Sequence, residues 1–388
     1  MILIAEPVHF GDTHVQVNAA FVSLFKNIFP QHQIEVVAEE KHIDAMRRIA
    51  GDKLATVNFA GFKQYSQNGP FFWFQKIWGE WQQIFKVVLK AKKEKPELLV
   101  WLCLFPTGHL LLRFLHILLI PKQKHLVVCH GELAYLSKMN KRWSEKVLAL
   151  ILKKALKHSP DNVHYLVLGQ SIKDNLPERI CTDKAKVLVF QHPFLYDSEI
   201  IKKDLSKEFK VCVFGALTKE KNVHLIYEIA SRFEDEIKSG IIQFQTFGRL
   251  QPQLAIYQNS LVQSYRPETF LPHQELEEQL LEQDLALFFY DQSMYELCAS
   301  GALHEALNLQ LPFISFRNEY FVQMNQDWSL GVIVNNLDEM EVTLKALLEK
   351  RIQRISEFQT ANIMFLQQNS FLLQSEKLKS VLKQAALV

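Results

Sequence analysis

The residues best suited to chemistry stand directly after apolar runs, where strands would end. In the C-terminal half, residues 285–316 read as strand, loop, helix and strand, with Ser300 and Gly301 at the expected start of the helix. A helix N-terminus has unpaired N–H groups and a partial positive charge, which favour an anion. Gly301 allows close backbone approach, and Ser300 offers a hydroxyl to a phosphate. The alternative is that Ser300 only caps the helix.

Glu305 lies one turn inside the same expected helix. A capping box needs its acid three residues after the cap, and that position is occupied by Leu303. Capping therefore does not explain Glu305. Acids in nucleotide-binding α/β folds accept hydrogen bonds from a ribose, so we expect Glu305 to contact a nucleotide.

Lysines follow another strand in this half. The sequence VCVFGALTKEKN ends an apolar run at Gly215 and places Lys219 and Lys221 before an expected helix. A lysine at a helix start opposes the helix dipole, and a bound diphosphate would offset that cost. The alternative is that both lysines are solvated loop residues.

A second basic strand end is the sequence TFGRL, which holds Gly248 and Arg249. Downstream, Leu271 precedes an expected helix at 275–282, where backbone groups suit a flat base. A metal-binding DxD motif is absent from the sequence, so we expect no metal.

The N-terminal half has weaker candidates. The sequence VVCHGE places His130 and Glu132 after an apolar strand, and Gly11 and His14 follow the first strand. A lone histidine is more often structural than functional. A single glycine falls far short of the GxGxxG fingerprint, so a nicotinamide-dependent oxidoreductase is not supported.

The elements that must position these residues alternate between strand and helix, which indicates parallel sheets wound on both faces. The expected strands are 1–6, 33–37, 54–59, 98–104, 125–129, 163–168, 186–190, 209–214, 241–247, 285–290 and 312–316. The expected helices are 15–28, 74–91, 108–120, 142–157, 222–233, 275–282 and 301–309, with a helical tail from 337 to 388.

The alternation lapses in a polar connector and then restarts, which predicts two Rossmann-like halves. We expect domains at 1–205 and 206–370, with 371–388 a C-terminal helix that packs back on the first domain. Ligands of such sheets sit beyond the carboxyl ends of the strands. The class is therefore α/β, with two doubly wound sheets facing across a cleft.

Composition limits the class of protein. The chain has 388 residues, 48% hydrophobic and 22% charged, which is typical of globular proteins. Its five cysteines are scattered, without a CxxC pair, which favours a reducing compartment. The first residues lack a basic signal-peptide start, and the apolar stretch at 98–121 is interrupted by proline, glycine, arginine and histidine. We therefore expect a cytoplasmic protein.

The charge is unevenly distributed. The net charge is +2, yet residues 76–157 hold sixteen lysines and arginines against five acids. Within this region, 71–95 combines the aromatic run FFWFQKIWGEW with lysines, a composition that suits an anionic membrane surface. The alternative is a buried aromatic face with a solvated lysine face. Nucleic acid is a poorer partner, because no recognition motif appears.

Three motifs in order, FGALTKEKN, FGRL and SG–HEALNLQLP, make residues 209–316 resemble the nucleotide-sugar domain of GT-B glycosyltransferases, nearest to the large retaining family 4. The resemblance is looser in the first half, where it rests on Gly11 and on VCHGE. It implies sugar transfer from a UDP- or GDP-sugar to a glycan or lipid-linked acceptor, without a cofactor or metal.

The resemblance also implies residue roles. Lys221 would contact the diphosphate together with the start of the helix at Ser300 and Gly301, Glu305 would contact the ribose, and His130 would lie beside the donor sugar. Gly215, Lys219, Gly248, Arg249 and Leu271 complete the expected donor site, while Gly11, His14 and Glu132 belong to the acceptor or sugar side.

Two departures from the family pattern stand out. Ala216 occupies a place where the family usually has arginine, and Arg249 is a candidate replacement. Glu296 and Glu305 are nine residues apart instead of eight, with Leu297 at the expected place, which puts the role of Glu296 in doubt. Two alternatives therefore stay open: a nucleotide-sugar epimerase of the same fold, and a catalytically silent partner subunit. The expected process is synthesis of cell-surface polysaccharide or glycolipid.

Overall fold

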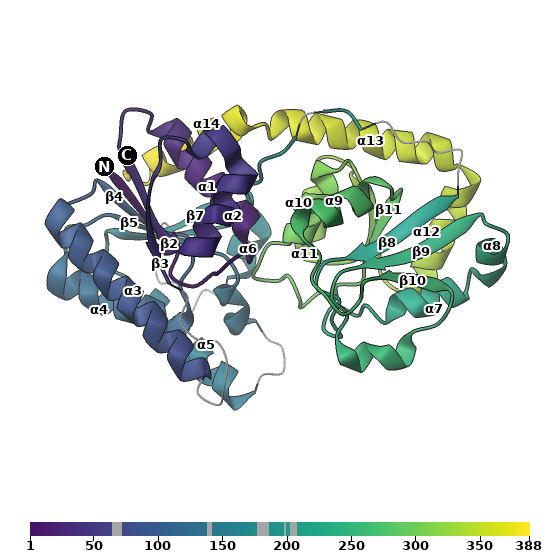
Figure 1. Ribbon diagram of the computed structural model, residues 1–388, viewed down its shortest axis with the longest axis horizontal. Helices are drawn as coiled ribbons and strands as arrows, with labels where there is room; N and C mark the ends of the chain where they lie inside the picture. Colours follow the sequence, from purple (N-terminus) through teal and green to yellow (C-terminus); the bar gives the residue numbers. More distant parts are fainter. Residues whose placement is uncertain (64–71, 138–141, 177–185, 198, 202–207) are drawn as a thin grey trace. The chain divides into compact units, whose positions relative to one another are not determined.

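The computed structural model describes residues 1–63, 72–137, 142–176, 186–197, 199–201 and 208–388. The chain divides into two compact units (Figure 1). The N-terminal unit comprises Met1–Leu195, Leu297–Ala299 and Phe371–Val388, and the C-terminal unit comprises Tyr196–Glu296 and Ser300–Ser370. The domain boundary expected at residue 205 lies outside the described residues.

The N-terminal unit is built on a seven-stranded parallel sheet of order β3-β2-β1-β4-β5-β6-β7. Its strands are β1 (Ile2–Ala5), β2 (Ile34–Glu39), β3 (Asn58–Phe62), β4 (Leu98–Trp101), β5 (His125–Cys129), β6 (Val163–Val167) and β7 (Val187–Val189). Central strand β1 pairs with β2 on one side and with β4 on the other. The sequence order reverses between β1 and β4, so the loops that follow these two strands diverge at a topological switch point.

Two groups of helices cover this sheet (Figure 1). In one group, α1 (Val15–Ile28) packs against α2 (Glu40–Ala50) and α14 (Phe371–Gln384). In the other, α4 (Pro106–Leu119) packs against α3 (Phe72–Glu94) and α5 (Trp143–Lys157). The short helix α6 (Gln170–Asn175) follows β6.

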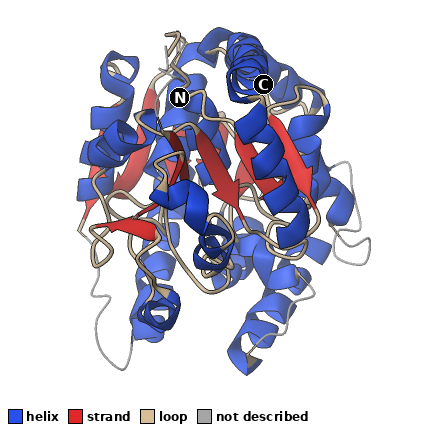
Figure 2. Ribbon diagram, turned by 90° about the vertical axis from the view of Figure 1, so that its right-hand side faces the viewer, coloured by secondary structure: helices blue, strands red, loops and turns tan. Residues whose placement is uncertain are grey.

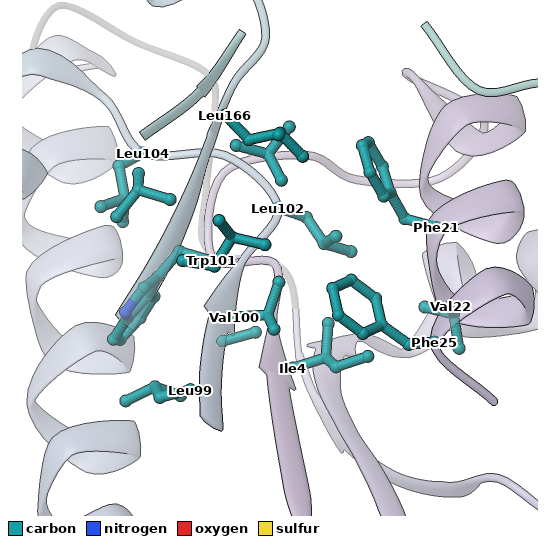
Figure 3. Packing of buried hydrophobic residues seen from close by; sticks show 14 of the residues in the cluster. Ile4, Phe21, Val22, Phe25, Leu99, Val100, Trp101, Leu102, Leu104 and Leu166 are labelled. Atoms are coloured by element: carbon teal, nitrogen blue, oxygen red, sulfur yellow. The ribbon is translucent and has the colours of Figure 1, made fainter. Parts of the chain in front are cut away.

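The core of this unit follows from the pleat of β4, in which successive side chains point to opposite faces. In Figure 3, Val100 points toward the helix that carries Phe21 and Phe25, whereas Trp101 points to the other face. All four side chains are at most 1% exposed. An uninterrupted apolar run is what a strand buried on both faces requires.

The C-terminal unit contains a six-stranded parallel sheet of order β10-β9-β8-β11-β12-β13. Its strands are β8 (Phe209–Phe214), β9 (Ile242–Phe247), β10 (Val262–Tyr265), β11 (Leu285–Phe288), β12 (Phe313–Phe316) and β13 (Gly331–Val334). The helices are α7 (Leu225–Ser231), α8 (Glu234–Lys238), α9 (His273–Leu281), α10 (Gly301–Asn308), α11 (Glu319–Gln326), α12 (Leu337–Glu349) and α13 (Arg351–Gln368). Figure 2 shows strands flanked by helices in this arrangement.

The alternation of strands and helices predicted from the sequence is confirmed, with corrections at several ends. The predicted position of the strand at 54–59 is wrong: Gly51–Leu54 form a 3-10 turn, and β3 begins at Asn58. Leu54 is buried as part of this turn, and sequence hydrophobicity does not separate that burial from burial in a strand. The strands expected at 98–104 and 285–290 end early, at Trp101 and Phe288.

Several elements were not predicted at all. The helix α2 is polar over much of its surface, β10 buries only its first residue, and β13 buries only its first and last residues. The helix expected from residue 222 begins at Leu225, because Asn222 takes a left-handed backbone conformation with φ 53°. Within the described residues, no helix is long and apolar enough to cross a bilayer.

Two glycines hold the ends of β8 and β9 together. The N–H of Gly215 donates to the carbonyl of Phe247 at 2.9 Å. A Cβ atom added at Gly248, whose φ is +127°, would lie 2.0 Å from the carbonyl oxygen of Gly215. Position 248 therefore excludes any side chain unless the two loops separate.

We predict that Gly248→Ala lowers the free energy of unfolding by about 3 kcal/mol, from the disallowed backbone angle and the steric clash together. Urea denaturation followed by tryptophan fluorescence measures this loss. Gly240→Ala is the matched control, because Gly240 has φ +69° but no atom within 4 Å of an added Cβ. Equal losses for the two variants would show that the contact with Gly215 contributes nothing.

Candidate functional site

In the N-terminal unit, the loop after β1 is organised by the carboxylate of Glu6, which is fully buried. This carboxylate accepts hydrogen bonds from the N–H groups of Val8 and His9 at 2.8 and 3.0 Å, and from Asn18 Nδ2 at 3.0 Å. His9 Nδ1 lies 3.1 Å from Glu6 Oε2, the carboxylate oxygen that also accepts from Asn18. Burial alone would raise the pKa of Glu6, but the contacts with His9, His42 and the Val8 N–H lower it to about 2.

Gly11, predicted as part of the reacting loop, is held from both sides by the start of α2. Its N–H donates to Glu39 Oε2 at 3.1 Å, and its carbonyl oxygen lies 2.6 Å from His42 Nδ1. The φ of Gly11 is +53°, and an added Cβ would meet no atom within 4 Å. The loop is thus fixed in position while its outer side stays open.

Four histidines gather at the carboxyl ends of β1, β5 and β7. The ring centroid of His14 lies 4.3 Å from that of His9 and 4.2 Å from that of His130, and His192 lies 5.8 Å from His130. His14 and His130 were predicted from the sequence as candidate site residues, whereas His9 and His192 were not. Both follow strands closely, so the rule applied to His130 would have found them.

His130, which like His192 is a buried member of this cluster, is neutral at physiological pH. Burial, followed by the nearby imidazoles of His14 and His192, holds its pKa well below the usual range. Its Nδ1 is buried and has no hydrogen-bond partner among the described residues. A neutral imidazole offers one donor and one acceptor, which suits hydroxyl groups of an uncharged sugar.

Glu132 supports this loop from behind. Its side chain is buried, and one carboxylate oxygen accepts the N–H groups of His130 at 2.9 Å and Gly131 at 3.1 Å. The other oxygen lies 3.4 Å from His109 Nε2. The structure therefore places Glu132, predicted on the sugar side, as an acceptor for the backbone that carries His130.

In the C-terminal unit, the loops after β8 and β11 are linked at the carboxyl edge of the sheet. Asn222 Nδ2 donates to the carbonyl of Phe289 at 3.1 Å, and Lys221 Nζ lies 5.5 Å from the ring centroid of Tyr290. Lys219 is exposed, and its N–H donates to Gln251 Oε1 at 2.9 Å. The structure thus positions Lys221 against an aromatic ring and leaves the side chain of Lys219 at the surface.

The loop after β9 carries Arg249, whose side chain is exposed and lies 5.4 Å from the ring centroid of Phe270. Leu271, next in sequence, is half-buried. A cation beside an exposed aromatic ring is an arrangement that can receive a flat base and its phosphate. Ala216 is exposed on the neighbouring loop and adds no charge there.

Ser300 caps α10. Its side chain accepts the N–H of Leu303 at 3.3 Å and is fully buried, as the capping alternative predicted. Gly301, the first helical residue, is exposed and would meet nothing within 4 Å if it had a Cβ. The exposed group at this helix start is therefore the backbone of Gly301.

Glu305 has a buried carboxyl whose Oε1 has no hydrogen-bond partner among the described residues. The nearest basic atom is His273 Nδ1 at 3.8 Å, at the start of α9. Burial, with a smaller contribution from Glu277, raises the pKa of Glu305 to about 8. The neighbouring His304 is fixed between the hydroxyls of Tyr196 and Tyr320, at 2.5 and 2.6 Å, which sets the orientation of α10.

The second glutamate of the expected pair lies in a loop and not in a helix. Glu296 is half-buried in the loop after β11. Leu297, at the position where the resembling family has an acid, is only 2% exposed. A buried apolar side chain therefore occupies the position where the resembling family has its acid. Among the described residues there is no cluster of three histidine, cysteine or acidic side chains arranged for a metal ion.

No protein-family model and no curated protein matches the sequence. The structure is similar to HepE of Anabaena, solved in complex with UDP and glucose, with a TM-score of 0.68 and 11% identity over 98% of this chain and 99% of HepE. It is also similar to WaaG, a glycosyltransferase involved in lipopolysaccharide biosynthesis, with a TM-score of 0.64 and 12% identity over 98% and 99%.

A putative UDP-N-acetylglucosamine 2-epimerase from Listeria monocytogenes matches as well, with a TM-score of 0.58 and 11% identity over 98% of this chain and 95% of the epimerase. Identities this low show the fold alone. Two α/β units with parallel sheets of seven and six strands, together with these neighbours, define the two-domain, Rossmann-like GT-B fold.

We predict that stability falls as pH rises from about 5 to 8, because Glu305 is protonated in the folded protein across this range and ionised in the unfolded chain. Burial also raises the pKa of Glu80, on α3, to about 8, so both glutamates contribute. Glu305→Gln removes one contribution, worth about 1.4 kcal/mol per pKa unit. Thermal unfolding at pH 5 and pH 8 measures the slope.

The exposed Glu349→Gln is the control for charge. It should keep the wild-type slope, whereas Glu305→Gln should show a smaller fall in Tm between the two pH values. Identical slopes for wild type and Glu305→Gln would contradict a raised pKa at this position.

Proposed function

We propose that this protein is a glycosyltransferase that moves a sugar from a UDP- or GDP-sugar to a glycan or lipid-linked acceptor. The observation that supports it most is the buried Glu305 carboxyl, whose Oε1 has no hydrogen-bond partner among the described residues, in the helix that begins at Gly301. Lys221 and Arg249 lie on neighbouring strand ends. The fold that contains these residues aligns with 99% of HepE, a protein crystallised with UDP-glucose.

In this proposal the C-terminal unit binds the nucleotide. Glu305 pairs with the ribose hydroxyls, which satisfies its unpaired oxygen, and Lys221 and the exposed backbone of Gly301 neutralise the diphosphate. Preorganised charges of this kind stabilise the charge that develops on a leaving diphosphate by several kcal/mol. The reaction then needs no cofactor and no metal, and by resemblance it retains the anomeric configuration.

The N-terminal unit supplies the sugar side. The Gly11 loop and neutral His130 stand at the carboxyl ends of β1 and β5. Glu132 and Glu6 hold these loops in place through backbone N–H groups. The fixed Gly11 loop and neutral His130 bind sugar hydroxyls, and the C-terminal unit binds the diphosphate of the donor.

We predict that Gly301→Ala weakens UDP-glucose binding about tenfold while leaving stability unchanged. The added methyl has free space in the protein but obstructs the approach of a phosphate to the helix start. Glu305→Leu should weaken binding by about 1–2 kcal/mol, because it removes the hydrogen-bonding groups that would face the ribose. Calorimetric titration with UDP-glucose and GDP-mannose measures both effects.

Ser231→Ala, remote from the strand ends in α7, is the matched control for this binding assay. If neither nucleotide sugar binds the wild-type protein, or if the variants bind as tightly as wild type, the donor site is elsewhere or absent. NMR of the incubated donor separates the two remaining alternatives: an epimerase changes the sugar without an acceptor, and a silent partner leaves the donor intact.

The proposed location is the cytoplasmic face of a membrane, in synthesis of a cell-surface polysaccharide or glycolipid. Within the expected aromatic segment 71–95, of which residue 71 lies outside the described residues, Phe72–Glu94 form α3. The exposed apolar side chains of α3 include Trp73, Phe74 and Trp78 at 54–68%. Neighbouring helices α4 and α5 expose Phe114 at 61% and Trp143 at 80%. A surface of this kind, with exposed Lys86, Lys92, Lys93, Lys146 and Lys154, suits an anionic lipid headgroup layer.

We predict that the protein co-sediments with phosphatidylglycerol vesicles at low salt and is released by 0.5 M salt, because the lysine contribution is screened. Trp78→Gln with Phe114→Gln should reduce the bound fraction about tenfold, since each removes an inserted aromatic side chain. Ile256→Gln with Val342→Gln, at even more exposed sites of the C-terminal unit, is the control. Equal binding by both double variants would locate the contact elsewhere.

A further inference from the structure

A pocket of about 440 Å³ lies within the N-terminal unit, beside the Gly11 loop. Its lining combines five residues of the loop after β1 with one lysine from each of two helices: Val8, His9, Phe10, Gly11, Thr13, Lys41 of α2 and Lys76 of α3. The volume falls within the range of sites for small organic ligands, roughly 300–1,000 Å³. None of the functions assigned above uses the two lysines.

The charge of this pocket is one-sided. Its lining has two lysines and no acid. Among the described residues neither lysine forms an ion pair, and Lys76 Nζ instead lies 5.1 Å from the ring centroid of Phe105. The nearby carboxyl of Glu80 does not neutralise Lys76, because burial raises its pKa to about 8 and keeps it protonated.

The position of Lys41 also indicates that the pocket suits an anion. It stands in the first turn of α2, where a positive charge opposes the helix dipole. Glu39 already accepts one N-terminal N–H group of α2, that of His42, and it also accepts the N–H of Gly11. The lysine side chains are therefore the cationic groups that the pocket offers to an anion.

The base of the pocket is suited to a hydroxyl. His9 lines the pocket, and its Nδ1 is directed to the Glu6 carboxylate at 3.1 Å. This contact leaves Nε2 as the ring nitrogen that can form a hydrogen bond with a hydroxyl. The pocket thus joins an imidazole nitrogen to two point charges, and two charges match a phosphate dianion better than a carboxylate.

We propose that this pocket binds a phosphoryl group of the acceptor that receives the sugar, with Lys41 and Lys76 as its cationic partners; this assignment of the acceptor rests on the function proposed above. The phosphoryl group belongs either to a phosphorylated saccharide or to a phospholipid headgroup. In both cases the acceptor carries its negative charge close to the Gly11 loop.

Lysine acetylation of the full chain, followed by mass spectrometry, tests this proposal with UDP present to saturate any donor site. Glucose 6-phosphate at twice its dissociation constant should slow acetylation of Lys41 and Lys76 about threefold, because bound ligand shields a proportional fraction of molecules. Exposed Lys379 and Lys383 of α14 are the internal controls. Uncharged glucose at the same ionic strength should protect neither pair.

Phosphatidylglycerol vesicles form the second arm, with phosphatidylcholine vesicles as their comparison. Protection by glucose 6-phosphate indicates a phosphorylated saccharide, and protection only by phosphatidylglycerol indicates a lipid headgroup. In calorimetry with whichever probe protects, Lys41→Gln with Lys76→Gln should lose at least about tenfold in affinity, and Lys379→Gln with Lys383→Gln should lose none.

No protection by either probe, or equal protection by glucose, would overturn the proposal. The donor titration is independent of this result, because its variants lie in the C-terminal unit. Protection of the two lysines without nucleotide-sugar binding would keep the phosphate site and reject the transfer reaction. Nucleotide-sugar binding without protection would reject the phosphate site alone.

Discussion

Each sheet of this protein is wholly parallel, and that constraint places every candidate residue. A parallel strand can pair with its neighbour only if the chain crosses back to the starting edge, so all loops that follow strands emerge at one edge. In the N-terminal unit that edge gathers Glu6, His9, Gly11 and His130 from β1 and β5. In the C-terminal unit it gathers the loops of β8, β9 and β11. Residues separated by eighty positions or more thereby become neighbours.

Buried acids then fix the loops at these edges. Glu6 and Glu132 have their carboxylates bonded to backbone N–H groups, and an acid so bonded fixes the loop that contributes those groups. Glu305 differs, because one of its oxygens is buried without a hydrogen-bond partner among the described residues. An unsatisfied buried polar group costs about 1–3 kcal/mol, and a ligand that satisfies it recovers this cost on binding. The same chemical group therefore has a supporting role at two strand ends, and in α10 we propose a binding role for it.

The surface of the N-terminal unit complements this organisation. Helices α3, α4 and α5 bury one face against each other and the sheet, yet keep large aromatic side chains exposed beside lysines. Within α3, Trp78 is 54% exposed while Glu80, two residues later, is buried and accepts the Phe105 N–H at 2.7 Å. Helix α3 thus holds the N-terminus of α4 with one face, and another face exposes apolar and basic side chains. Lys76, on the same helix, lines the pocket beside Gly11.

The sequence by itself determined the class of the fold, because alternating apolar runs and helical periodicity depend on local spacing. It also determined the order of the strand-end motifs, including Gly215, Gly248 and Glu305. It did not separate the 3-10 turn at Leu54 from a strand, since both bury an apolar side chain. It did not predict β10 and β13, which bury only one and two of their four residues and so lack the continuous buried run of the other short strands.

Only the tertiary structure decided what each polar residue contacts. The sequence gives no sign that Glu132 turns back to the His130 loop, and it left open whether Ser300 caps the helix or contacts a phosphate. It also gives no sign that Lys41 and Lys76, thirty-five positions apart, line one pocket. Residue type and spacing set which chemistry is available, whereas hydrogen-bond partners depend on which loops the sheet order brings to the same edge.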